Sequence, residues 1–159
     1  MKLRAALVML FFCWGWQVRA QSPVGAGAEP SRPLHTRALE TMQAERARAK
    51  QTLCAKAANT MAIDACYSRE LVTTDGNYVK LVRALGAMIR AGENSAPTRL
   101  PFDDAESAWS AYRDQACEAD GSFFAGGTIR PMVEARCHIT ITQHHLEELW
   151  ALYSDIDRE

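Results

Sequence analysis

Apolar side chains recur along this chain at alternating steps of three and four residues, the period of one face of an α-helix. The longest such run consists of Tyr67, Leu71, Thr74, Tyr78, Leu81, Leu85 and Met88. It keeps its phase across Asp75 and Gly76, a pair that would otherwise suggest a turn. The pattern therefore predicts one long helix that ends near Gly92.

A sparser stripe precedes this long helix. From about Thr36 the chain is rich in Ala, Arg, Glu, Lys and Gln, which favour helices. The apolar positions of this segment are Leu39, Met42, Ala49 and Leu53. Between the two helices, Asn59 and Thr60 offer a turn and an N-cap for the second. The two segments are expected to form a helical hairpin.

The last third of the chain predicts a second hairpin. After a connector with two prolines, segment 103–106 is acidic and has the spacing of a capping box. The apolar face that follows consists of Ala105, Trp109, Tyr112, Ala116 and Ala119. Beyond loop 122–128, Pro131 suits a first helical position, and a last stripe comprises Met132, Ala135, Ile139, Thr142, Leu146, Leu149, Tyr153 and Ile156. No segment reads as a strand, so we expect an all-α fold of about four helices.

The N-terminus has the layout of a secretory signal. Residues 1–20 comprise a cationic start, an apolar run of 12 residues and small residues before the expected cleavage. The run is shorter than the roughly 20 residues that span a bilayer, and Phe12 before Cys13 disfavours lipid attachment. We expect a flexible tether over 21–35 and a single domain over 36–159. The product would be periplasmic or secreted, with no membrane segment after cleavage.

Four cysteines remain after cleavage: Cys54, Cys66, Cys117 and Cys137. An even number in an oxidising compartment favours two disulfides. The alternative, a four-thiolate zinc site, usually shows paired Cys-x-x-Cys motifs, which this chain lacks. Of the three possible pairings we expect the local ones, Cys54 with Cys66 and Cys117 with Cys137. Each joins the ends of a predicted hairpin, and a disulfide needs Cα atoms within about 7 Å.

Charge divides unevenly along the chain. Residues 21–102 carry 11 basic and 7 acidic side chains, whereas 103–159 carry 4 and 12. A nucleic-acid-binding protein would need a dense basic face, which the acidic half argues against. A basic protein partner fits better. The alternative is that the acidic surface only maintains solubility.

One set of residues in the second hairpin has a specific joint spacing: Trp109, Tyr112, Arg113, Asp114, Cys117, Gly126, Gly127, Arg130, Pro131, Cys137 and Thr142. This set resembles the lysozyme inhibitor LprI-like family of small exported bacterial domains. Upstream, Cys54, Met61, Cys66 and Glu70 match the opening of the same pattern, so the resemblance covers about 54–149. It implies an extracytoplasmic helical domain, and lysozyme inhibition is reported for the namesake. Position 145, often Arg in relatives, is His145 here.

Considered without the family, the motif residues have structural roles. Trp109 and Tyr112 are expected to be core anchors that bury large areas. Arg113 and Asp114 are adjacent on a helix and so do not face each other. Each is expected to pair with a neighbouring helix or to cap the glycine-rich loop, which a buried Arg would order.

The sequence offers little support for a metal site or a catalytic site. His144 and Glu148 share a helical face near His138 and His145, but no His-Glu-x-x-His motif is present and two side chains cannot close a zinc site. We expect no metal and no cofactor. Carboxylates form no recognisable acid/base motif, so we also expect no enzyme.

The leading hypothesis is a binding protein that blocks a lysozyme-like muramidase by covering its cleft. The acidic half would supply long-range attraction. The loop with Phe123, Phe124, Gly126 and Gly127 would enter the cleft, although at least one of the two phenylalanines is expected to fold back onto the core. The alternatives are an envelope structural or accessory protein without inhibitory activity, and a hydrolase whose site the sequence hides.

Overall fold

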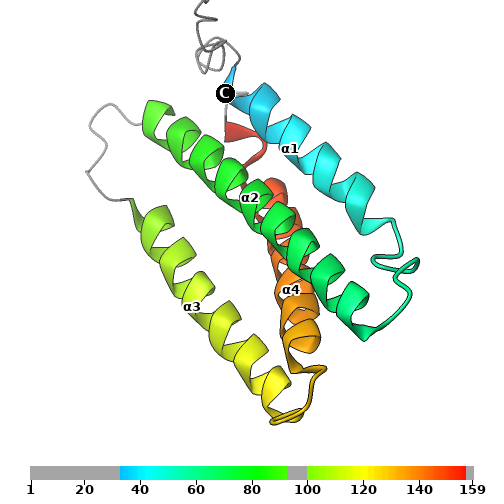
Figure 1. Cartoon of the computed structure of the whole chain (residues 1–159). Coiled ribbons are helices and arrows are strands. Elements are labelled where there is room, and N and C mark those ends of the chain that lie inside the picture. The colour runs from blue at the N-terminus through cyan, green and yellow to red at the C-terminus, as the bar shows by residue number, and fades with distance from the viewer. Residues whose placement is uncertain (1–32, 93–99, 157–159) are drawn as a thin grey trace, which may run out of the picture. The chain divides into compact units, whose positions relative to one another are not determined.

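The computed structural model describes residues 33–92 and 100–156 (Figure 1). Its helices are α1 (Leu34–Ala49), α2 (Thr60–Gly92), α3 (Pro101–Ser122) and α4 (Arg130–Tyr153). The described ranges contain no strand. The predicted all-α fold of about four helices is confirmed. The expected signal peptide, 1–20, and most of the expected tether lie outside the described residues.

The helix boundaries follow local capping. Helix α2 begins where predicted, because Asn59 Oδ1 accepts the backbone N–H of Ala62 at 2.9 Å. It runs through Asp75 and Gly76 without a break. Helix α3 begins earlier than predicted, at Pro101, because Asp103 Oδ2 accepts the N–H of Leu100 at 2.9 Å. Asp103 therefore lies inside the first turn instead of opening it.

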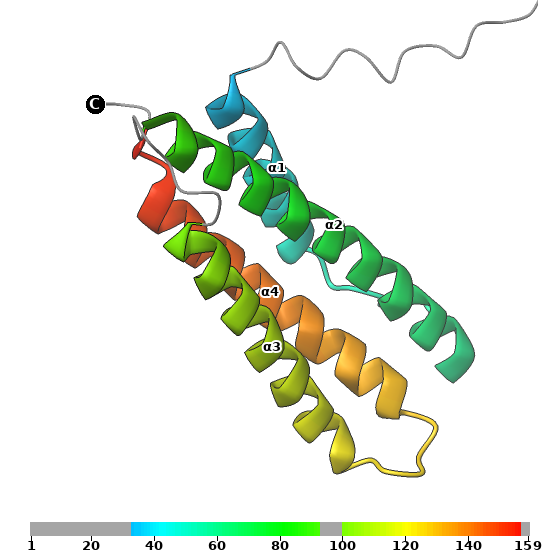
Figure 2. The same ribbon diagram turned by 90° about the vertical axis from the view of Figure 1, so that its left-hand side faces the viewer.

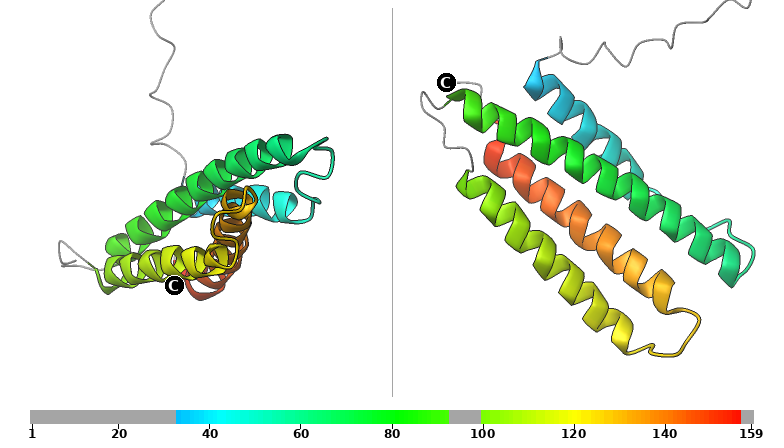
Figure 3. Two further views of the ribbon diagram at one scale, coloured as in Figure 1. Left: turned by 60° about the horizontal axis from the view of Figure 1, so that its bottom comes forward. Right: turned by 60° about the vertical axis from the view of Figure 1, so that its left-hand side comes forward.

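The four helices form two antiparallel hairpins, α1 with α2 and α3 with α4. Helices α2 and α4 pack together at the centre, α1 lies mainly against α2, and α3 lies mainly against α4 (Figure 2). Helices α2 and α3 contact each other little, and α4 is visible between them in the right-hand view of Figure 3. The two short connections lie at the same end of the bundle. The α2–α3 pair is thus the open side of the bundle.

The core is built from the predicted stripes of α2 and α4 and from part of α1. Its fully buried side chains include Leu81, Leu85 and Met88 of α2, Ile139 and Leu146 of α4, Met42 of α1, and Leu100 just before α3. Burying each large aliphatic side chain contributes about 1.5–3 kcal/mol. On α1 the buried positions are Ala38, Met42 and Glu45, so the expected stripe is correct only at Met42.

Helix α3 turns a different face to the bundle from the one predicted. Its buried residues are Phe102, Glu106, Cys117 and Gly121, whereas Ala105 and Ala119 are exposed. The predicted apolar face is rotated away from the core. The physical reason is that two charged side chains, Glu106 and Arg113, occupy the inward face and are satisfied there by partners on other helices.

Both disulfides have the expected local pairing. Cys54, in the middle of the α1–α2 connection, is linked to Cys66 of α2, with Cα atoms 5.8 Å apart. Cys117 of α3 and Cys137 of α4 are linked with Cα atoms 5.5 Å apart. Each disulfide therefore closes one hairpin near its short connection.

Candidate functional site

The loop between α3 and α4 carries the most exposed aromatic side chain of the described residues. Phe123 is 85% exposed, and Phe124 and Ile129 are 38% and 37% exposed. The Cys117–Cys137 disulfide links the two helices that carry the loop. A large apolar side chain is thus displayed on a loop of restricted freedom.

The backbone of this loop is a series of tight turns. The N–H groups of Phe124, Ala125 and Gly127 each donate to a carbonyl three residues earlier. Gly126 has φ +77°, in the left-handed region that favours glycine. A Cβ atom on Gly127 would approach the Phe124 carbonyl oxygen to 3.1 Å. The path of the chain therefore favours glycine at both positions, at Gly126 through its φ angle and at Gly127 through its close approach to Phe124.

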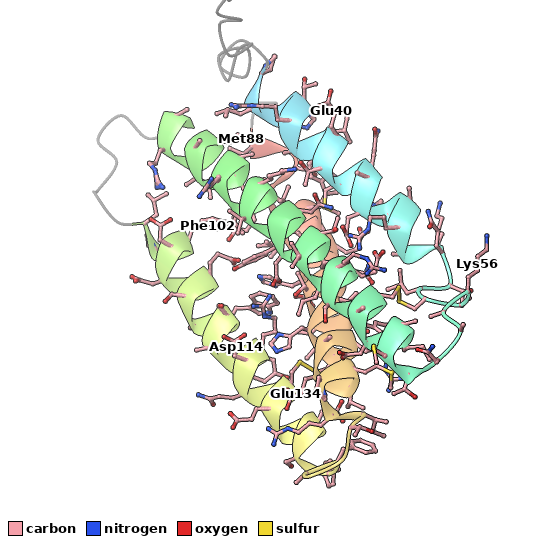
Figure 4. All side chains as sticks on the ribbon, in the orientation of Figure 1. Glu40, Lys56, Met88, Phe102, Asp114 and Glu134 are labelled. Atoms are coloured by element: carbon pink, nitrogen blue, oxygen red, sulfur yellow. A yellow bond between two sulfur atoms is a disulfide. The ribbon has the colours of Figure 1, made fainter. Side chains whose placement is uncertain are left out.

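The end of α3 beside the loop is close-packed and acidic. Gly121 is buried, and a methyl group there would overlap the Glu134 side chain of α4, which lies near this end of α3 in Figure 4. Glu134 Oε1 accepts from Arg130 Nε at 2.6 Å. Helix α3 carries six acidic side chains and one basic one, Arg113. Pro131, the second residue of α4, follows Arg130 directly, in the first turn of the helix.

Arg113 joins three helices in a mostly buried position, with its side chain 11% exposed. Its Nη1 donates to Asp75 Oδ1 of α2 at 2.8 Å and to Thr142 Oγ1 of α4 at 3.0 Å. Its Nη2 also donates to Asp114 at 3.2 Å. The expectation that Arg113 and Asp114 do not face each other is wrong, because the long guanidinium stem bends back to its neighbour.

Aromatic rings and a buried carboxylate lie beside Arg113. The Trp109 ring stacks on His145 with centroids 3.9 Å apart, and Arg113 lies 5.4 Å from the Trp109 centroid. Glu106 Oε2 accepts from the Tyr78 hydroxyl at 3.1 Å and lies 3.0 Å from His145 Nε2. Burial and the negative charge of Glu106 raise the pKa of Tyr78 well above its ordinary value. Tyr78 therefore stays neutral and acts as a hydrogen-bond donor.

The structure corrects the expected position of Tyr112. Its side chain is 62% exposed and is not a core anchor. Trp109 is half-buried, between Tyr78 and His145. The cause is the rotation of α3, which turns Arg113 inward and moves Tyr112, one residue before it, to the solvent.

The histidines considered for metal binding have other neighbours. His138 Nδ1 lies 3.7 Å from Asp114, and burial together with the Arg113 charge lowers the pKa of His138. His145 Nδ1 lies 3.3 Å from Glu148. Among residues 33–92 and 100–156 no three His, Cys, Asp or Glu side chains are placed to hold a metal ion. Within the same residues no helix has the length and apolar character needed to cross a membrane.

A second polar network, around Glu45 of α1, was missed by sequence reasoning. Glu45 is 3% exposed and accepts hydrogen bonds from Thr74, Asn77 and Gln143. Arg48 pairs with Glu45 and with Glu70. The available signal was that Glu45 follows Ala38 and Met42 at helical spacing, on the inward face of α1.

Comparisons with known proteins match the same part of the chain. The family profile described as "Lysozyme inhibitor LprI" matches residues 54–149. An uncharacterized protein of Rhizobium meliloti (strain 1021) is 27% identical over 104 residues, which are 60% of this chain and 75% of that protein. No solved structure matches the chain significantly. The matched region contains both disulfides, Arg113 with its partners Asp75, Asp114 and Thr142, and the α3–α4 loop.

Proposed function

This chain belongs to the lysozyme inhibitor LprI family, and we propose from that premise that it is an exported binding protein that blocks a lysozyme-like muramidase. The observation that carries the proposal is the α3–α4 loop, with Phe123 85% exposed beside the Cys117–Cys137 disulfide. Muramidases hold two catalytic carboxylates on either side of the glycosidic bond, in a cleft. A loop that projects from a rigid hairpin suits such a concave site.

The loop limits the entropy lost on binding. Its turns and the disulfide already restrict the backbone, so little further ordering is needed when the loop enters the cleft. Phe123 acts as the anchor, since exposed aromatic side chains dominate many interfaces. Gly126 and Gly127 allow the backbone to approach the cleft wall closely. Phe124, which is 38% exposed, offers a second apolar side chain beside this anchor.

The charge of α3 suits a basic target. The only basic side chain of α3, Arg113, is 11% exposed and is bonded to three neighbours, so its outer surface is acidic. Such a surface attracts a basic enzyme over a distance and orients it toward the loop. Export fits the two disulfides, which form and persist outside the cytosol.

The test is inhibition of muramidase activity by the purified, disulfide-bonded protein. Lysozymes of different structural types are titrated with the protein, and we expect stoichiometric loss of activity for at least one. Phe123→Ser should weaken inhibition at least tenfold without loss of thermal stability. Leu152→Ser is the matched control, because Leu152 is also highly exposed, at 72%, but lies on α4.

A second variant tests the backbone of the loop. Replacing both Gly126 and Gly127 with bulky residues should weaken inhibition while the helices stay folded. If both loop variants inhibit like the parent, the loop is not the inhibitory element. If the parent inhibits no lysozyme of any type, inhibition is not its function, and an accessory role in the envelope becomes the better interpretation.

A further inference from the structure

The two disulfides differ in how well a thiol could react with them. Cys117 is fully buried, so a thiolate cannot reach its sulfur, and attack on Cys137 would expel a Cys117 thiolate that is shielded from water. Cys54 and Cys66 are both half-buried. Together they line an open hollow of about 510 Å³ beside the α1–α2 connection. Thiol–disulfide exchange is therefore favoured at Cys54–Cys66.

The backbone of Cys54 is in a strained conformation. Its φ is 60°, in the left-handed region, and no other non-glycine residue of the described ranges has a positive φ. This region is unfavourable for a residue with a Cβ atom. Cys54 is fixed by its bond to Cys66 and by a turn in which its carbonyl accepts from the N–H of Ala57 at 3.0 Å. Opening the disulfide allows Cys54 to relax, and strained disulfides are the more readily reduced ones.

The hollow beside this disulfide is positively charged. The exposed side chains of Lys56, labelled in Figure 4, and Arg69 line it, and none of the described residues that line it is acidic. Arg69 follows Cys66 by three residues on α2 and so lies on the same face of the helix. Glu70, beside Arg69 in the chain, is paired with Arg48. Positive charge attracts an incoming thiolate and stabilises the thiolate that leaves.

We propose that Cys54–Cys66 is a redox-active disulfide that exchanges with thiols bearing carboxylate groups. The thiolate of such a compound attacks Cys54 Sγ and forms a mixed disulfide with it. The electron pair of the broken S–S bond goes to Cys66 Sγ, which leaves as a thiolate beside Arg69. A second thiol attacks the incoming sulfur of the mixed disulfide and releases Cys54. Two thiols are thus oxidised to one disulfide, and their two protons pass to Cys54 and Cys66.

The hollow favours a thiol with carboxylates by its charge and its size. Lys56 and Arg69 can each pair with a carboxylate, and Gln51 and Thr52 add polar side chains to the wall. Small-molecule sites usually have volumes of about 300–1,000 Å³, so the hollow has room for a short peptide. Glutathione, a tripeptide thiol with two carboxylates, is therefore a suitable probe.

Reduction at this site should leave the four-helix fold intact. Arg48, near the end of α1, donates to the backbone carbonyl and the carboxylate of Glu70 and to Thr74 Oγ1. These bonds hold α1 to α2 without the disulfide. The part of the chain that gains freedom is the connection 50–59. The exchange is therefore local and reversible, and it takes place on the hairpin that does not carry the α3–α4 loop.

The experiment treats the disulfide-bonded protein with glutathione at about pH 7, stops the reaction with acid and maps the peptides by mass spectrometry. Free cysteines are then alkylated and counted. We expect Cys54–Cys66 to be opened at least tenfold faster than Cys117–Cys137, with glutathione attached to Cys54 in the intermediate. Circular dichroism of the product should still show the helices of the parent.

A pair of charge variants tests the role of the hollow. Lys56→Gln together with Arg69→Gln should slow opening by glutathione severalfold, and should slow opening by the cationic thiol 2-mercaptoethylamine less. Rates are compared at equal thiolate concentration, because the two thiols differ in pKa. Lys80→Gln together with Arg83→Gln is the matched control, since it removes the same charge from exposed positions of α2 that do not line the hollow.

Two results would overturn the proposal. One is opening of both disulfides at the same rate, which would mean that the hollow gives Cys54–Cys66 no advantage. The other is an equal effect of the two double variants on the reaction with glutathione, which would mean that Lys56 and Arg69 do not recognise the thiol. Muramidase inhibition is measured separately, so the failure of one proposal does not decide the other.

Discussion

Glu45 shows how one residue can make stability depend on pH. Burial opposes its ionisation, but hydrogen bonds from Gln143 and Asn77 and the charge of Arg48 outweigh it, so the pKa of Glu45 lies below its ordinary value. Because the folded pKa is lower than the unfolded one, the ionised carboxylate stabilises the fold above pH about 4.5. This contribution is lost as the pH falls through the folded pKa.

We predict that Glu45→Gln loses about 2 kcal/mol at pH 7, because Arg48 keeps a partly buried charge with one partner fewer. Its free energy of unfolding should also fall less steeply than that of the parent between pH 5 and pH 3. Urea denaturation at several pH values measures both effects. Glu147→Gln is the control: its ion pair with Arg46 is exposed and should contribute less than about 1 kcal/mol. Equal losses in the two variants would contradict the prediction.

Two neighbouring aromatic residues of α3 should differ sharply in their effect on stability. Trp109→Ala removes a ring that contacts Tyr78, His145 and Arg113 and should cost about 3 kcal/mol. Tyr112→Ala removes an exposed ring and should change stability by no more than about 0.5 kcal/mol. Chemical denaturation measures both. If Trp109→Ala left stability intact but abolished partner binding, Trp109 would belong to a recognition surface.

At the scale of elements, the three- and four-residue spacing of apolar side chains was enough to predict those helices whose buried face is apolar. Helix α2 follows its stripe through Leu81, Leu85 and Met88, and its N-cap at Asn59 was readable from the sequence. Helix α3 does not bury its predicted apolar stripe, because its inward face includes the charged residues Glu106 and Arg113. Their partners, such as Asp75 and His145, are far away in the sequence, so no local pattern reveals that these charges can be buried.

The same limit applies to the candidate site. The loop was predictable, since two glycines lie between cysteines that link the two helices of a hairpin. Which of its two phenylalanines would be exposed was not predictable, and the structure leaves Phe123 85% exposed. The open side between α2 and α3 was not predictable. It depends on how the two hairpins pack, which the sequence encodes through contacts between distant residues, such as that of Arg113 with Asp75 of α2.

Removing either disulfide should cost roughly 3 kcal/mol, because the closed loops contain about 13 and about 21 residues. The two should differ in function. Replacing Cys117 and Cys137 with Ala should also weaken muramidase inhibition, since the loop loses its restraint, whereas replacing Cys54 and Cys66 should affect stability alone. Thermal unfolding and inhibition assays on both double variants provide the measurements. Equal inhibition by the two variants would mean that the disulfide does not preorganise the loop.

For the molecule as a whole, the uneven charge gives α3 and its loop an acidic surface while residues 21–102 remain basic. A net charge alone would influence solubility more than recognition. The asymmetry matters because two exposed acidic residues of α3, Glu118 and Asp120, precede the exposed Phe123 by only five and three residues. Long-range attraction and the anchoring side chain are therefore on the same end of the bundle.

The last prediction follows from this arrangement. If the acidic surface steers a basic muramidase, the association rate should fall several-fold as ionic strength rises from about 0.01 M to 0.15 M, because the screening length shrinks from about 30 Å to about 8 Å. The dissociation rate should change much less, since it depends on close contacts of the docked loop. Surface plasmon resonance at several salt concentrations separates the two rates. Glu118→Gln together with Asp120→Asn should reduce the salt dependence of association, while Phe123→Ser should raise the dissociation rate and leave that dependence intact. A salt effect confined to dissociation would show that the acidic surface acts in the docked complex and does not steer the encounter.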